Sequence, residues 1–209
     1  MREHTSAVPL VLMVLLCAGA GGCELMQRSA APIPPRSIPY HRVGVLQFED
    51  RSRYSGTGDE FTNLLAQEMA RLTISTDVVV IPRSALPKMS GRDPLAEGCI
   101  PLKVLTDVRE RYRVQALVLG SLDDHNPYWK PFAHISVKIM DTGDAKVLCE
   151  FSDRWDAGCP RDEREIRAFY RRNRERDECR FGPDLFTISP RYFLMYVSNS
   201  VAHRMLAAL

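Results

Sequence analysis

Residues 42–52 read Arg-Val-Gly-Val-Leu-Gln-Phe-Glu-Asp-Arg-Ser, an apolar run that ends in a polar turn. This stretch predicts a buried strand at the start of a folded domain. The residues before it have the composition of a leader and a tether, and the residues after it alternate between helical and strand patterns. The chain of 209 residues has room for one domain with a sizeable core and some appendages.

The region after the first strand predicts a strand–helix–strand–helix–strand core. Thr57 and Glu60 have the spacing of a capping box, and Pro101 marks the start of a second helix. Two continuous apolar runs indicate strands that are covered on both faces. Right-handed crossovers then give a largely parallel three-stranded core. The expected elements are helices over residues 59–72 and 101–112, and strands over residues 77–81 and 116–122.

The sequence pattern changes in the second half of the chain. Residues 132–140 alternate apolar and polar side chains, with His134, Ser136 and Lys138 on the polar face, and a Gly-containing turn leads to a returning run at 146–151. This pattern predicts a β-hairpin that adds antiparallel strands to one edge of the sheet. The fold class is therefore α/β, a single domain over residues 42–209 with a mixed sheet. Residues 153–190 are expected to form a charged helical insertion, and residues 191–209 an amphipathic C-terminal helix.

The first 22 residues are predicted to be a lipoprotein signal peptide. Their apolar run is shorter than the 20 or so residues that span a bilayer. Residues 20–23, Ala-Gly-Gly-Cys, resemble a lipobox, in which Cys23 becomes the acylated first residue of the mature chain. The alternative is cleavage after Ala20, which would release a soluble periplasmic protein. Residues 23–41 are rich in proline and predict a semi-rigid tether.

The remaining cysteines are Cys99, Cys149, Cys159 and Cys179, an even number in an exported chain, which is consistent with disulfides. Four cysteines allow three pairings. We expect Cys159 to pair with Cys179, because this bond would close the charged insertion at its ends. Such a loop would contribute about 3 kcal/mol to stability. The spacing of cysteines and histidines fits no zinc motif, so we expect no metal and no cofactor.

Two stretches are candidates for a site. Residues 123–125, Asp-Asp-His, follow a predicted strand and carry the distant alternative of an exported hydrolase, although no nucleophile accompanies them. Tyr128 and Trp129 lie in a proline-bounded loop, and these residue types often anchor interfaces. They are the candidate partner-binding residues, and the alternative is that their rings fold back on the hairpin. A formal charge of +2 says little about partners. We expect no nucleic-acid partner, because that would need a concentrated basic face and only one segment is locally Arg-rich.

Four blocks of the sequence resemble one superfamily. They are residues 42–52, then Val-Val-Ile-Pro-Arg-Ser-Ala-Leu, Ala-Leu-Val-Leu-Gly-Ser-Leu, and Ser-Val-Lys-Ile-Met-Asp-Thr-Gly-Asp-Ala-Lys-Val-Leu, in the expected order over residues 42–151. The superfamily contains the curli-assembly lipoprotein CsgG, the penicillin-binding-protein activator LpoB and the amino-terminal domain of TolB. Where the first block usually has proline, this chain has Gln47.

The resemblance implies a non-enzymatic lipoprotein of the bacterial cell envelope. It would act as a binding, assembly or regulatory factor for an envelope protein or a peptidoglycan-associated partner. Its expected location is the outer membrane, facing the periplasm. The alternative is a subunit of a CsgG-like secretion ring, a homo-oligomer. The charged insertion is unsuited to a membrane-inserted hairpin, because such hairpins need apolar outward faces.

Overall fold

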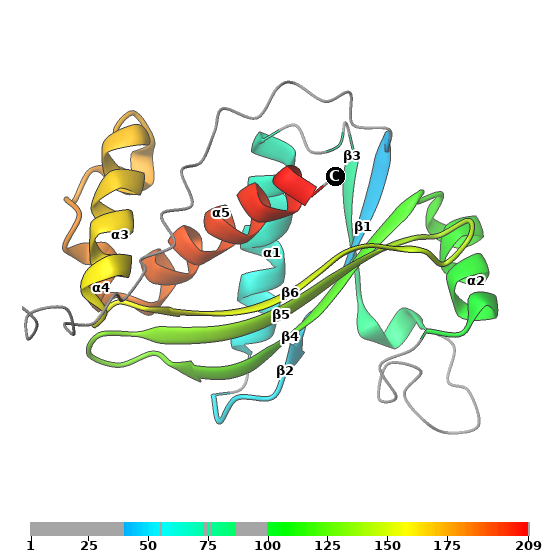
Figure 1. Cartoon of the computed structure of the whole chain (residues 1–209), viewed down its shortest axis with the longest axis horizontal. Helices are drawn as coiled ribbons and strands as arrows, with labels where there is room; N and C mark the ends of the chain where they lie inside the picture. Colours follow the sequence, from blue (N-terminus) through cyan, green and yellow to red (C-terminus); the bar gives the residue numbers. More distant parts are fainter. Residues whose placement is uncertain (1–39, 55, 73–74, 76, 87–99, 209) are drawn as a thin grey trace, which may run out of the picture. The chain divides into compact units, whose positions relative to one another are not determined.

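The computed structural model describes residues 40–54, 56–72, 75, 77–86 and 100–208 (Figure 1). The predicted signal peptide, Cys23, Cys99 and all but the last two residues of the predicted tether lie outside the described residues. The lipidation prediction is therefore not tested by the structure.

The domain is built on a mixed six-stranded sheet in the order β3-β1-β4-β5-β6, with the short β2 paired to β4. The strands β3, β1 and β4 are parallel, whereas β4, β5 and β6 run antiparallel to one another. This arrangement confirms the predicted α/β fold with a βαβαβ core and an added hairpin. The strands are β1 (Arg42–Leu46), β2 (Glu49–Asp50), β3 (Asp77–Ile81), β4 (Ala116–Asn126), β5 (Phe132–Asp141) and β6 (Val147–Asp156).

Helices cover the two faces of the sheet unequally. The first face is covered by helices α1 and α5, which lie against each other, and by α3 and α4 (Figure 1). On the second face, α2 and a 3-10 turn, η1, cover only the part near β1 and β3. The helical elements are α1 (Thr57–Arg71), η1 (Arg83–Ala85), α2 (Leu102–Tyr112), α3 (Pro160–Arg172), η2 (Asp177–Cys179), α4 (Leu185–Ile188) and α5 (Pro190–Ala208).

The apolar alternation of the sequence explains the core. Ala133, Ile135, Val137 and Ile139 of β5 are all buried on the first face, as the hairpin pattern predicts. One expectation about the strands is wrong. We expected the valine-rich β3 to be covered on both faces, but it is an edge strand of the sheet. Its Val80 is 39% exposed, so the apolar run is not fully covered.

The first helix is capped by a residue other than the predicted one. α1 begins at Thr57 itself, so Thr57 cannot serve as its N-cap. Instead, the Asp50 carboxylate at the end of β2 accepts the backbone N–H groups of Thr57 (3.1 Å) and Gly58 (3.2 Å). A carboxylate in this position satisfies two of the amides that a helix start leaves without partners, and it also complements the helix dipole.

The charged insertion is less separate than its composition suggests. Residues 153–156 belong to β6, and α3 begins only at Pro160. On the outer side of α3, Arg161 pairs with Glu165 and Arg167 with Glu163, as expected of a self-paired helix. Its inner side carries Ile166 and Phe169, which are fully buried in the main core, with Phe169 packed edge-on against Phe186 of α4. The insertion is thus part of the core of the domain.

The C-terminal helix α5 buries residues on more than one of its faces. The expected apolar positions Leu194, Val197, Val201 and Met205 are fully buried, which confirms that they pack in the core. However, every residue from 193 to 199 is buried, so α5 has no continuous polar face in its first half. It lies between α1, β6 and α4, which leaves little of this half open to solvent.

The predicted disulfide between Cys159 and Cys179 is not formed, and we correct this expectation. Cys159 is half-buried directly before α3, whereas Cys179 is buried in η2, beyond the far end of that helix. Because α3 has 13 residues, it extends the chain by about 20 Å between the two cysteines. The insertion is held by packing and by an ion pair from Arg176 to Glu68 of α1 (2.8 Å).

Candidate functional site

The connection between β4 and β5 forms an exposed aromatic tip. Tyr128 is 65% and Trp129 75% exposed, so neither ring folds back onto the hairpin. The Tyr128 N–H donates to the Asn126 side chain (3.1 Å), and a left-handed backbone at Lys130 (φ 55°) turns the chain towards β5. These local contacts hold two large side chains outward on a short, ordered connection. We call residues 127–131 the hairpin tip.

Beneath the hairpin tip, three rings touch in sequence. The ring of Tyr128 meets Tyr54 edge-on at 5.5 Å between centroids, and Tyr54 meets His125 edge-on at 6.3 Å. His125 is only 3% exposed, and neither of its ring nitrogens has a hydrogen-bond partner among the described residues. Burial lowers the pKa of the imidazole, although the charges of Asp50 and Asp124 act in the opposite direction. The imidazole is therefore held in its neutral form near neutral pH.

Asp50 connects this group of rings to α1. Besides capping the helix through one oxygen, its carboxylate accepts the Ser52 N–H (3.0 Å) and Oγ–H (2.6 Å) through the other. The Thr57 hydroxyl donates in turn to the Tyr54 carbonyl oxygen (3.1 Å). Asp50 thus holds two parts of the chain in place: the segment that carries Tyr54, and the start of α1.

The uncovered part of the second face carries a row of hydroxyl groups. Ser121, Ser136 and Ser152 are paired directly across β4, β5 and β6. Ser136 Oγ lies 2.9 Å from Ser152 Oγ, and Ser152 Oγ lies 2.9 Å from His134 Nε2. The hydroxyls of Ser121 and Ser136 donate to Asp123 at 2.6 and 2.5 Å. The polar alternation of the sequence indicated this face, but it could not give the register that aligns the serines.

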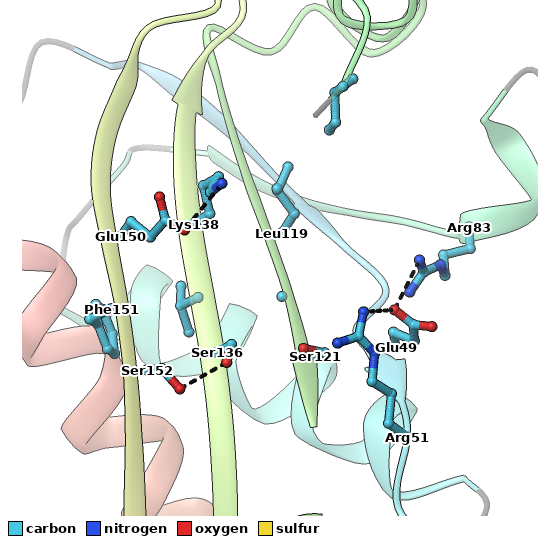
Figure 2. Close-up of a pocket in the computed structure, with 13 residues that line it drawn as sticks. Glu49, Arg51, Arg83, Leu119, Ser121, Ser136, Lys138, Glu150, Phe151 and Ser152 are labelled. Atoms are coloured by element: carbon cyan, nitrogen blue, oxygen red, sulfur yellow. Dashed lines mark hydrogen bonds and ion pairs between the residues drawn. The ribbon is translucent and has the colours of Figure 1, made fainter. Parts of the chain in front are cut away.

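Figure 2 shows the groove that opens over this row, with a volume of about 330 Å³. Glu49 lies between Arg51 (2.8 Å) and Arg83 (3.6 Å) at one side, and Lys138 pairs with Glu150 (3.1 Å) at the other. Each of these cations already has a carboxylate partner. The groove is therefore lined by hydroxyl groups and neutralised ion pairs together with apolar residues such as Ile100 and Leu119, so it presents a mixed polar and apolar surface with little net charge.

The three residues of the hydrolase alternative do not converge. We expected them in a loop, but β4 continues through Asn126 and contains them. A bulge between Leu122 and Asp124 interrupts the alternation of side chains between the two faces of the sheet. Asp123 lies on the same face as Ser121, as strand alternation requires, and binds Ser121, Ser136 and Arg51 (3.3 Å). The bulge places His125 on the other face, where it pairs with Ala133 and lies beneath Tyr54.

Metal and membrane features were also sought in the described residues. They contain no group of His, Cys, Asp or Glu side chains that could hold a metal ion. Within the same ranges, no helix is long and apolar enough to cross a membrane.

The sequence alone identified part of this site. It placed Tyr128 and Trp129 in a proline-bounded loop, where the structure shows them exposed, and it indicated the polar face of the hairpin around Ser136. It missed Tyr54 and the burial of His125, because both depend on contacts between segments far apart in the chain. The polar character of residues 123–126 hid the continuation of β4.

The sequence matches no protein-family model and no curated protein. Solved structures give matches of low identity. PelC from Paraburkholderia phytofirmans, solved as a dodecamer, matches with 12% identity and a TM-score of 0.47 over 80% of this chain and 86% of that chain. Lipoprotein GNA1162 from Neisseria meningitidis matches with 10% identity and a TM-score of 0.40 over 56% and 80%. The LpoB C-terminal domain from Salmonella enterica matches with 9% identity and a TM-score of 0.40 over 56% and 84%.

Proposed function

We propose that this chain is a non-enzymatic lipoprotein of a bacterial cell envelope, which binds an envelope protein or a peptidoglycan-associated partner through its hairpin tip. The exposure of Tyr128 and Trp129 at the end of an otherwise well-packed hairpin is the observation that carries this proposal. Large aromatic rings lose little conformational entropy on binding and often supply most of the energy of an interface.

The anchor is the second part of the proposal. Acylation of Cys23 would attach the chain to the outer membrane on the periplasmic side, since each buried CH₂ of a lipid chain contributes about 0.8 kcal/mol. The proline-rich residues 24–41 would then hold the domain away from the bilayer surface. Cleavage after Ala20, with release into the periplasm, is the competing outcome.

The anchor can be tested by fractionation and metabolic labelling. We expect labelled palmitate to be incorporated into the wild-type chain and the protein to sediment with membranes. The Cys23→Ala variant should lose both the label and the membrane association. If this variant still sedimented with membranes, the anchor proposal would be wrong, whatever the role of the hairpin tip.

The tip can be tested by site-specific photo-cross-linking in cells. A photoreactive phenylalanine analogue replaces Trp129 in one strain, and in a matched control it replaces Phe181, which is 72% exposed on the insertion. We expect an adduct of defined mass from position 129 that position 181 does not give. An adduct with a second copy of the chain would favour the secretion-ring alternative. Identical adduct patterns at both positions would contradict docking through the tip.

A further inference from the structure

The hairpin tip rests on a buried histidine through a chain of three rings. Tyr128 packs on Tyr54, and Tyr54 packs on His125, with interplanar angles of 79° and 89°. Edge-to-face contacts of this kind depend on the ring orientation. A change in the state of His125 therefore acts directly on the surface that carries Tyr128.

The charged groups around His125 come from two strands. Asp50, from β2, and Asp124, from β4, are the carboxylates whose charges act on the imidazole. Asp124 pairs with His134 in the sheet and is exposed, so it lies towards the solvent side of the strand. Tyr54 is the aromatic neighbour and is half-buried.

The Asp50 carboxylate is not available to a protonated imidazole in the present arrangement. Both oxygens of Asp50 are occupied by Ser52, Thr57 and Gly58, in contacts of 2.6–3.2 Å. A proton on His125 would create a buried charge without an acceptor, which is costly. The charge can be relieved if Asp50 leaves the helix cap for His125, which also frees the segment that carries Tyr54.

We propose that His125, Tyr54 and the Asp50 cap form an acid-sensitive device, which releases the Tyr54–Tyr128 contact when His125 becomes protonated. The direction follows from linkage. Because burial lowers the folded-state pKa of His125 below its ordinary value of 6.5, the unfolded or opened state binds the proton more readily. The arrangement in which His125 is buried beneath Tyr54 is fully stable above the ordinary pKa of 6.5. It loses stability as the pH falls below 6.5 towards the folded-state pKa of His125.

This inference deepens the proposed function, since it assigns regulation by acid to the same hairpin tip. A periplasmic surface of this kind would present Tyr128 and Trp129 in one arrangement at neutral pH and in another after acidification. The device itself is independent of the partner. Its failure and the failure of the docking proposal can therefore be told apart.

The test follows the three amides that bind Asp50. In the purified full-length protein labelled with ¹⁵N, hydrogen-exchange protection of Ser52, Thr57 and Gly58 is measured at pH 7 and pH 5 and corrected for the intrinsic exchange rates. We expect the wild type to lose protection at pH 5. The His125→Phe variant keeps an aromatic ring under Tyr54 and should retain protection. The matched control His134→Gln, on the serine face, should behave as the wild type.

A second measurement keeps the proposal falsifiable if His125→Phe does not fold. The Cε1–H resonance of His125 in the wild type is followed over the same pH range, and its titration should coincide with the loss of amide protection. Equal protection at pH 7 and pH 5 in the wild type would overturn the proposal. So would a His125→Phe variant that folds and loses protection as the wild type does.

Discussion

Glu68 shows how a single buried carboxylate joins three parts of the domain. It is 2% exposed in α1, and it accepts hydrogen bonds from Arg71 of the same helix (2.8 Å), Arg176 of the insertion (2.8 Å) and Asn199 of α5 (2.9 Å). Because donors from three side chains surround the Glu68 carboxylate, their hydrogen bonds compensate the cost of removing its charge from water. Removing it would leave Arg176, which is itself largely buried, without this carboxylate.

The Glu68→Ala substitution should therefore be strongly destabilising. We expect a loss of about 3–5 kcal/mol in the free energy of unfolding, the range found when one member of a buried ion pair is removed. Chemical denaturation measures this loss. Glu60→Ala, an exposed site on the same helix, is the control and should change stability by about 0.5 kcal/mol or less. Equal effects at both positions would contradict the role given to Glu68.

The same carboxylate predicts a dependence of stability on pH. Burial by itself raises the pKa of Glu68, but the hydrogen bonds from Arg71, Arg176 and Asn199 outweigh it, so that the pKa lies below its ordinary value of 4.5. A carboxyl group with a lowered pKa contributes stability that is complete above the unfolded-state value and is lost as the pH falls through the folded-state value. Unfolding free energies measured from pH 6 to pH 3 should decline, and Glu68→Gln should give a flatter profile. A Glu68→Gln profile as steep as that of the wild type would show that other groups cause the decline.

At the scale of elements, α1 depends on a cap that comes from another strand. We expect Asp50→Ala to lower the free energy of unfolding by about 0.5–2 kcal/mol, because two N–H groups at the helix start lose their acceptor. Thr57→Ala is the control. It removes only the hydroxyl that donates to the Tyr54 carbonyl, and its effect on thermal or chemical unfolding should be smaller. A larger effect of Thr57→Ala would restore the capping-box interpretation.

The elements also show how far the sequence alone can lead. Strand β3 and the helix after Pro101 were predicted almost to the residue, because their apolar periodicity and their starting signals are local. The last four residues of β4, Asp-Asp-His-Asn, have little strand propensity and were expected in a loop. They are strand because β5 pairs with them, and a partner strand can override local preference.

The same reasoning explains the errors at the helix start and at His125. A capping box is a local motif, and a cap from Asp50 is a tertiary contact that spacing cannot reveal. The burial of His125 depends on a bulge in β4, which changes the face to which the side chain points. Both features came from contacts made only after the chain had folded.

For the molecule as a whole, the cysteines give a clear test. A disulfide between Cys159 and Cys179 would contribute about 3 kcal/mol to stability, whereas the structure forms no such bond. We therefore expect Cys159→Ser to change the free energy of unfolding by less than about 0.5 kcal/mol under oxidising conditions, as at other sites without a special role. Chemical denaturation with and without a reducing agent provides the measurement. A loss of several kcal/mol that is confined to oxidising conditions would show that the bond exists.

Strand β5 separates the hairpin tip from the point at which the described chain enters the domain. The first described residue, Tyr40, donates its hydroxyl to Asp141 at one end of this strand (3.1 Å), and the hairpin tip precedes Phe132 at the other end. The ten residues of β5 separate these two points by about 30 Å. The hairpin tip therefore lies a full strand length along the sheet from the residue at which the described chain enters the domain, so a partner bound at the tip would not cover that entry point.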